Sequence, residues 1–168
     1  MTTLYLVRHG ETIDNLAKTL QGQRQGELTP KGIAQMEELA MSLSDTHFDA
    51  IVSSDLKRAH DSALILNQKQ NTNVRLTDLL RERDWGDFTG RFIPDLDGLP
   101  LPQNVEGMDS MLRRAKMFLE WIKANYPTGT VLAVGHGIIN KAILAANSGK
   151  SASDIPDMTN AEYQVLEL

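Results

Sequence analysis

Two histidines in this chain each come one residue after an apolar segment. Residues 4–7 lead into Arg8 and His9, and residues 130–134 lead through a glycine into His136. Short apolar runs bounded by glycine are typical of buried strands, and ligands bind at the carboxyl ends of strands in open α/β sheets. An arginine beside a histidine at such an edge favours work on an anion, most of all a phosphoryl group. By themselves the two side chains could equally be solvated groups at the end of a strand.

A third apolar segment, residues 48–54, precedes a helical pattern that carries Arg58 in its first turns. Near a helix N-terminus, a side chain and free backbone N–H groups can point at one anion. We therefore expect a pocket that holds Arg8, His9, Arg58 and His136. Two guanidinium groups suit the nonbridging oxygens of a phosphoryl group. They would also lower the pKa of a neighbouring imidazole and keep it neutral and nucleophilic near pH 7.

The spacing of apolar residues predicts the elements that must position these groups. Strands alternate with amphipathic helices, which indicates βαβ units and a mostly parallel sheet covered on both faces. Residues 86–107 hold several glycines and prolines without periodicity and predict a loop-rich stretch. The expected strands cover 3–7, 48–54, 74–80, 130–134 and 162–168, and the expected helices cover 29–43 capped by Thr29, 56–66 capped by Asp55, 109–125 and 138–146.

Composition excludes several other classes of protein. The 168 residues suit one domain, and a net charge of −5 disfavours a general nucleic-acid binder. The chain has no cysteine, which rules out disulfides and thiolate chemistry. No apolar run approaches the length of a membrane span, and Met1 leads almost directly into the first strand. We expect a cytoplasmic protein without a signal peptide and without a nucleic-acid or membrane partner.

Four ordered blocks of the chain resemble the histidine phosphatase superfamily, the phosphoglycerate-mutase-like proteins. They are residues 6–12 together with Asn15, residues 53–59, residues 80–82 and residues 134–137. The resemblance runs from residue 4 to about 146. It implies a three-layer α/β/α sandwich with a mostly parallel central sheet, as one domain over 1–168 with a short, loop-rich cap insert over 91–107.

The resemblance also implies roles for the candidate catalytic residues. In this family the histidine of the first block attacks phosphorus and becomes phosphorylated, which falls on His9. Arg8, Arg58 and His136 are implied to bind the transferred group and to stabilise charge in its transition state. Glu82 matches the carboxylate that protonates the leaving oxygen and then activates water. Spacing alone favours a solvated carboxylate between Arg81 and Arg83, and the resemblance reverses that interpretation.

Further residues are expected on the substrate side of the pocket. Asn15, Gln21 and Gly22 match lining positions of the family, although by themselves they fit a helix-surface amide and a turn. Gly137 and the helix that it begins could donate backbone N–H groups to phosphate. No metal or cofactor is expected, because two arginines would repel a cation and no Asp or Glu cluster completes a ligand set.

Five residues depart from the usual pattern of the family. They are Gln25, Asp61, Ser62, Thr89 and Lys141. None of them removes a catalytic group. Together they place the chain outside the best-known mutase and bisphosphatase subgroups.

The short insert favours hydrolysis, because a mutase must exclude water from its phosphoenzyme. We expect a phosphomonoester hydrolase that acts through a phosphohistidine on a small phosphorylated metabolite and releases inorganic phosphate. The alternatives are a phosphoglycerate-mutase-type phosphotransferase, a phosphoprotein phosphatase and a non-catalytic phosphate-binding module. Four further arginines, at positions 24, 81, 83 and 91, would suit small acidic substrates such as sugar phosphates. The sequence leaves the oligomeric state open.

Overall fold

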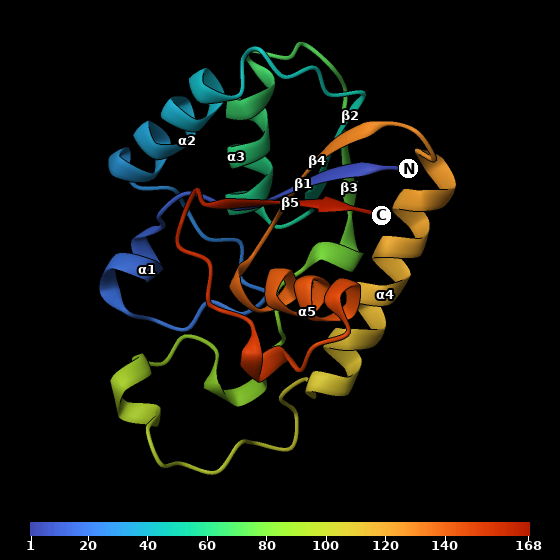
Figure 1. Cartoon of the computed structure of the whole chain (residues 1–168). Helices are drawn as coiled ribbons and strands as arrows, with labels where there is room; N and C mark the ends of the chain where they lie inside the picture. Colours follow the sequence, from blue (N-terminus) through green and yellow to red (C-terminus); the bar gives the residue numbers. More distant parts are fainter.

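A five-stranded sheet lies at the centre of the computed structural model, which describes residues 1–168. The strand order is β3-β2-β4-β1-β5 (Figure 1). Four strands are parallel, and β5 pairs antiparallel with β1 at one edge. The strands are β1 (Thr3–Arg8), β2 (Ala50–Ser54), β3 (Val74–Thr77), β4 (Thr130–Gly135) and β5 (Tyr163–Glu167).

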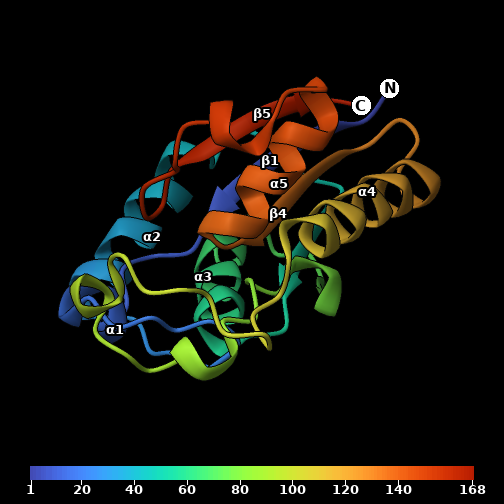
Figure 2. The ribbon, with the colours of Figure 1, turned by 90° about the horizontal axis from the view of Figure 1, so that it is seen from below.

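Helices cover both faces of this sheet and make the three layers that the sequence predicted (Figures 1 and 2). α2 and α3 pack together on one face, and α4 and α5 pack together on the other. None of the helices combines the length and the apolar character needed to cross a membrane. The helices are α1 (Ile13–Ala17), α2 (Pro30–Ser42), α3 (Lys57–Asn67), α4 (Met108–Asn125) and α5 (Gly137–Ser148), with short 3₁₀ helices η1 (Asp78–Leu80), η2 (Gly86–Phe88), η3 (Ile93–Leu96) and η4 (Ala152–Asp154).

The continuous apolar runs of the central strands follow from this layering. In β1, Leu4 and Leu6 are fully buried in the core beneath α4 and α5, whereas Val7 is buried in the core beneath α2 and α3. Successive side chains of a strand point to opposite faces of the sheet. A strand that is covered by helices on both faces therefore needs apolar residues on both sides. Each such side chain contributes about 1.5–3 kcal/mol on burial. The two cores therefore hold β1 and β4 rigidly at the centre of the sheet.

The N-terminal caps of two helices were predicted with different success. Thr29 caps α2, and its hydroxyl accepts a hydrogen bond from the Gly32 N–H at 2.9 Å. The prediction that Asp55 caps the next helix is wrong. Its carboxylate instead accepts two hydrogen bonds from Arg81, at 2.7 and 2.6 Å. The side chain of Gln25 accepts from the first N–H of α3, that of Lys57, at 2.9 Å, so a distant loop supplies the missing partner.

The loop-rich stretch over residues 86–107 includes the predicted cap insert over 91–107, and we call the whole stretch the cap segment. It lies beyond the carboxyl ends of the parallel strands (Figures 1 and 2). The segment contains η2 and η3 and otherwise irregular backbone. It is tied to the loop after α1 by backbone hydrogen bonds: the Leu20 N–H donates to Arg91 O at 2.9 Å, and the Ile93 N–H donates to Lys18 O at 2.8 Å. α1 was not predicted from the sequence. It depends on a capping box in which Thr12 and Asn15 bind each other's backbone N–H groups, both at 3.1 Å.

Candidate active site

The parallel pairing of β1 and β4 brings the two histidines together. Arg8 is in register with Gly135, and the His9 N–H donates to Gly135 O at 3.3 Å. The ring centroids of His9 and His136 are consequently 5.1 Å apart, with the rings inclined at 63°. Arg58 comes from the first turn of α3, directly after the neighbouring strand β2. The structure thus collects all four groups at the carboxyl edge of the sheet.

The tautomer of His9 is set by a hydrogen bond to its own neighbour. Its Nδ1 lies 2.7 Å from the carbonyl oxygen of Gly10. A carbonyl oxygen can only accept, so Nδ1 carries the proton and Nε2 keeps a free lone pair. Burial lowers the pKa of His9 well below 6.5, with further lowering by the positive charges of Arg58 and Arg8. Burial is thus a larger cause than the arginines that the sequence pointed to. The ring is neutral at pH 7 and has a nucleophilic nitrogen.

His136 is completely buried, and its Nε2 lies 2.9 Å from the hydroxyl of Ser54. Its other ring nitrogen, Nδ1, has no hydrogen-bond partner. Burial lowers the pKa of His136 well below 6.5, and Arg58 and His9 lower it further. Sequence reasoning gave Ser54 no role of its own, although it lies at the end of a predicted strand within a family-like block. Its hydroxyl can fix the orientation and tautomer of His136.

The two arginines are anchored by backbone carbonyls. Arg58 is 1% exposed, and its Nη2 donates to Gly22 O at 2.7 Å while Nη1 donates to Arg24 O. The Nη1 of Arg8 donates to Met158 O at 2.5 Å. Burial lowers the pKa of Arg58 to about 10, so the guanidinium stays charged at neutral pH. Both side chains are therefore held as cations in fixed positions.

Three of the four buried side-chain atoms that lack a hydrogen-bond partner belong to this cluster. They are Arg8 Nε, Arg58 Nε and His136 Nδ1, and the fourth is Asn140 Oδ1. A buried polar group left without a partner costs about 1–3 kcal/mol. The nitrogens of the two guanidinium groups can only donate. Donors concentrated around one imidazole are the partners that an anion with several acceptor oxygens requires.

Glu82 is 9% exposed and is held at the N-terminus of α5. Its carboxylate accepts hydrogen bonds from the N–H groups of Ile138 at 3.1 Å, Ile139 at 3.1 Å and Arg83 at 2.9 Å. Negative charge is favoured at this end of a helix. The alternative of a solvated carboxylate is wrong. The N–H groups of Ile138 and Ile139, at the helix end that was expected to donate to phosphate, instead donate to Glu82. Gly137 lines the cavity.

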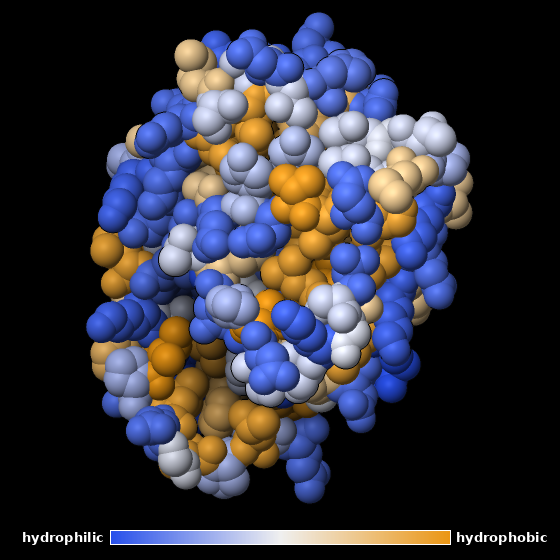
Figure 3. Space-filling model, in the orientation of Figure 1, coloured by the Kyte–Doolittle hydropathy of each residue, from blue (hydrophilic) through white to orange (hydrophobic).

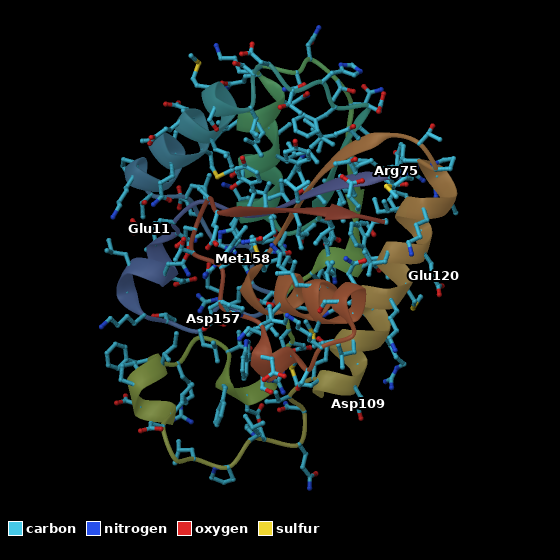
Figure 4. The ribbon with its side chains drawn as sticks, viewed as in Figure 1. Glu11, Arg75, Asp109, Glu120, Asp157 and Met158 are labelled. Atoms are coloured by element: carbon cyan, nitrogen blue, oxygen red, sulfur yellow. The ribbon has the colours of Figure 1, made fainter.

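A cavity of about 450 Å³ opens over these residues. His136 is not among its lining residues and lies behind them, with its ring packed against that of His9. Asp157 and Met158 border the cavity from the loop between η4 and β5, beside α5 (Figure 4). The predicted residues that line it are Arg8, His9, Asn15, Gln21, Gly22, Arg58, Glu82 and Gly137. Trp85 and Ile93 also line it, as one interpretation of the sequence had them, and the residues that sequence reasoning missed are Thr19, Leu20, Ile138, Asp157 and Met158.

The four additional arginines do not line this cavity, contrary to the expectation from the sequence. Arg81 is paired with Asp55. The Nε of Arg83 donates to Glu106 O at 2.6 Å, and its guanidinium lies over the ring of Trp85. Positive charge in the cavity therefore comes from Arg8 and Arg58. No group of three or more His, Cys, Asp or Glu side chains is arranged to hold a metal ion.

Comparisons with known proteins give one consistent result. A family model described as "Histidine phosphatase superfamily (branch 1)" matches residues 4–168. The uncharacterized phosphatase PhoE of Bacillus subtilis is 33% identical over 160 residues, which cover 89% of this chain and 79% of that protein. Phosphoserine phosphatase 1 of Hydrogenobacter thermophilus is 30% identical over 184 residues, with coverages of 100% and 87%. The solved structure of YhfR from Bacillus stearothermophilus superimposes with a TM-score of 0.93 at 28% identity, covering 100% of this chain and 92% of that one.

Proposed function

The chain belongs to the histidine phosphatase superfamily, and on this premise we propose that His9 is the residue through which it hydrolyses phosphate monoesters of small metabolites. The observation that carries the proposal is the free lone pair of His9 Nε2, which the hydrogen bond from Nδ1 to Gly10 O leaves available. Arg8 and Arg58 line the cavity with His9, the His136 ring packs against that of His9, and Arg8, Arg58 and His136 each have a buried nitrogen without a hydrogen-bond partner. The relatives named as phosphatases support the reaction class.

In the first half-reaction, His9 Nε2 attacks phosphorus and the bond between phosphorus and the ester oxygen breaks. Glu82 begins this step as the carboxylic acid and gives its proton to the leaving oxygen, which departs as an alcohol. Arg8 and Arg58, which line the cavity, donate to the nonbridging oxygens, where charge is spread in the transition state, and the buried ring of His136 packs against His9 beside them. Because these side chains are already fixed by the fold, little reorganisation accompanies the step.

In the second half-reaction, water attacks the phosphohistidine, Glu82 accepts a proton from that water, and the N–P bond breaks to release phosphate. Transfer to a second alcohol instead of water would require a closed site. Most residues of the cap segment, 15 of 22, are exposed, and the cavity stays open to solvent. This favours hydrolysis over mutase activity. The net charge of −5 supports the absence of a nucleic-acid partner, and the cytoplasmic location stays a prediction.

The experiment that tests the proposal measures release of phosphate from phenyl phosphate by the wild type, His9→Ala and His47→Ala. His47 is an exposed histidine far from the cavity lining and is the matched control. We expect His9→Ala to lower kcat by about 10³-fold or more, and the control to be unchanged. Rapid quenching of the wild type should trap phosphate on His9 that is labile in acid and stable in base.

Equal turnover by the wild type and His9→Ala, or trapped phosphate on another residue, would refute the assignment. Phosphate binding by the wild type without any turnover would instead point to the non-catalytic module. Preferential exchange of phosphate between isomeric phosphoglycerates over its release would identify a mutase.

A further inference from the structure

An apolar groove continues from the catalytic cavity along the cap segment. Its volume is about 470 Å³, and it shares the lining residues Leu20, Trp85 and Ile93 with the cavity. Figure 3 shows hydrophobic side chains gathered around a hollow in the lower part of this face. The shared walls mean that a molecule with its phosphoryl group at His9 can extend into the groove without leaving the protein surface.

The walls of the groove are apolar and partly open to solvent. Phe88 is buried at its base, whereas Leu99 and Leu101 are 44% and 57% exposed. Asp97 is the only charged residue of the lining. Concave, mostly apolar surfaces of this kind are typical of ligand sites. Covering a contiguous exposed apolar surface with an apolar ligand is also favourable in free energy.

The cavity and the groove hold no additional cationic side chain that could pair with a second negative charge of a substrate. Arg8 and Arg58 are the only cationic side chains of the combined lining, and they flank His9. Asp157, on the rim of the cavity, is itself an anion and pairs with Lys141 at 2.5 Å. A carboxylate next to the phosphate ester would therefore have no further cationic partner in the lining, which already carries the negative charges of Asp97 and Asp157.

From these observations we propose that the preferred substrates are monoesters of apolar alcohols, aliphatic or aromatic, whose hydrocarbon part occupies the groove. The phosphoryl group lies between Arg8 and Arg58, and the ester oxygen lies towards Glu82. The proposal rests on the function proposed above and specifies its substrate class. It replaces the expectation of sugar phosphates and other acidic substrates, which depended on arginines that do not line the site.

A series of unbranched alkyl phosphates tests this inference, because ethyl, butyl, hexyl and octyl phosphate differ in apolar length while their leaving alcohols are almost equally basic. We expect kcat/KM to rise by about tenfold or more from ethyl to hexyl phosphate, since each methylene adds binding in an apolar pocket. 3-Phosphoglycerate should have a lower kcat/KM than hexyl phosphate. Equal kcat/KM along the series, or a preference for 3-phosphoglycerate, would overturn the inference.

The variant Leu99→Asn locates the effect in the groove. We expect the ratio of kcat/KM for hexyl over ethyl phosphate to fall about fivefold or more, because a polar amide replaces an apolar wall. Leu64→Asn is the control, since Leu64 lies on α3 with a similar exposure of 46% and outside both linings. If the ratio falls equally in both variants, or in neither, the groove does not bind the hydrocarbon part of the substrate. If no alkyl or aryl phosphate is hydrolysed and no phosphohistidine forms, the proposed function fails, whereas turnover without dependence on chain length overturns only the substrate class.

Discussion

At the scale of single residues, burial decides the chemistry of the two histidines. The sequence placed His9 and His136 at strand ends beside arginines and so predicted neutral rings. In the structure, the largest cause of both lowered pKa values is removal from water, with Arg58 second. The degree of burial depends on side chains from distant elements, such as Ser54, which lies against His136. A local sequence pattern does not contain that information.

The lowered pKa values predict that the protein loses stability in acid. A buried histidine that stays neutral binds fewer protons when folded than when unfolded, so stability falls as the pH drops below the unfolded pKa of about 6.5. For each histidine, the free energy of unfolding should fall by about 1.4 kcal/mol per pH unit until its folded pKa is reached. Urea unfolding between pH 7 and 5 measures this slope.

The slope should be smaller by about 1.4 kcal/mol per pH unit in His9→Asn, because one of the two titrating rings is removed. His47→Asn is the control, since the His47 side chain is 85% exposed and should leave the slope unchanged. If His9→Asn shows the slope of the wild type, His9 titrates alike in the folded and unfolded states, and the neutral-nucleophile argument loses its basis.

At the scale of elements, α4 positions the segment that carries Glu82. Arg114, on α4, donates to the carbonyl oxygens of Leu79 at 3.0 Å and Arg81 at 2.8 Å. It also donates from Nη2 and Nε to the carboxylate of Glu106, at 2.9 and 3.0 Å. One side chain thus connects the end of η1, the end of the cap segment and a helix on the outer layer. Its only hydrogen bond to a residue of the cavity lining goes to the carbonyl oxygen of Glu82, at 3.4 Å.

Arg114→Met should therefore act as the loss of a positioning residue. We expect stability to fall by about 2–4 kcal/mol, because a largely buried ion pair loses one partner. We also expect kcat to fall by about tenfold with little change in KM, because the carboxylate of Glu82 is misplaced while the phosphate-binding side chains remain. Denaturant unfolding and steady-state kinetics with phenyl phosphate measure the two effects separately.

Arg113→Met is the control for this prediction, since Arg113 is the exposed neighbour on the same helix and has no ion pair. If Arg114→Met loses stability but keeps kcat at temperatures where it is folded, the network is structural and does not position Glu82.

The elements themselves were predictable to different degrees. The central strands and the four long helices follow from the period of their buried residues, which two closely packed cores impose. α1 has no buried residue, so it leaves no apolar pattern and depends on the hydrogen bonds of Thr12 and Asn15. Asp55 lies where a cap is favoured, but Arg81 from after β3 binds it more closely. Predicting that pairing requires the tertiary structure.

At the scale of the whole molecule, the candidate site joins parts of the chain that are otherwise separate. Its residues come from β1, α3, the segment after η1 and the junction of β4 with α5, which lie on both faces of the sheet (Figure 2). The order of these segments was predictable, because parallel strands place their carboxyl ends at one edge. The cap segment was not, because its course is set by backbone bonds to residues 18–20. An anion bound at the site would connect all of these segments at once.

Binding of inorganic phosphate should consequently stabilise the entire fold. A ligand that binds only the folded state adds about 2.7 kcal/mol at a concentration of 100 times its Kd, which for a protein of this size raises Tm by roughly 5–10 °C. Thermal unfolding in phosphate, compared with KCl at equal ionic strength, measures the gain.

Arg58→Met and Arg8→Met should each abolish most of this gain in stability, because each leaves one fewer cation for the phosphate oxygens. Lys57→Met, at the exposed residue that precedes Arg58 on α3, should keep it in full, since its ammonium pairs with Asp61 outside the cavity. A gain that survives in both arginine variants, or that KCl reproduces, would mean that phosphate acts on the molecule as a general salt and that no cradle around His9 binds it.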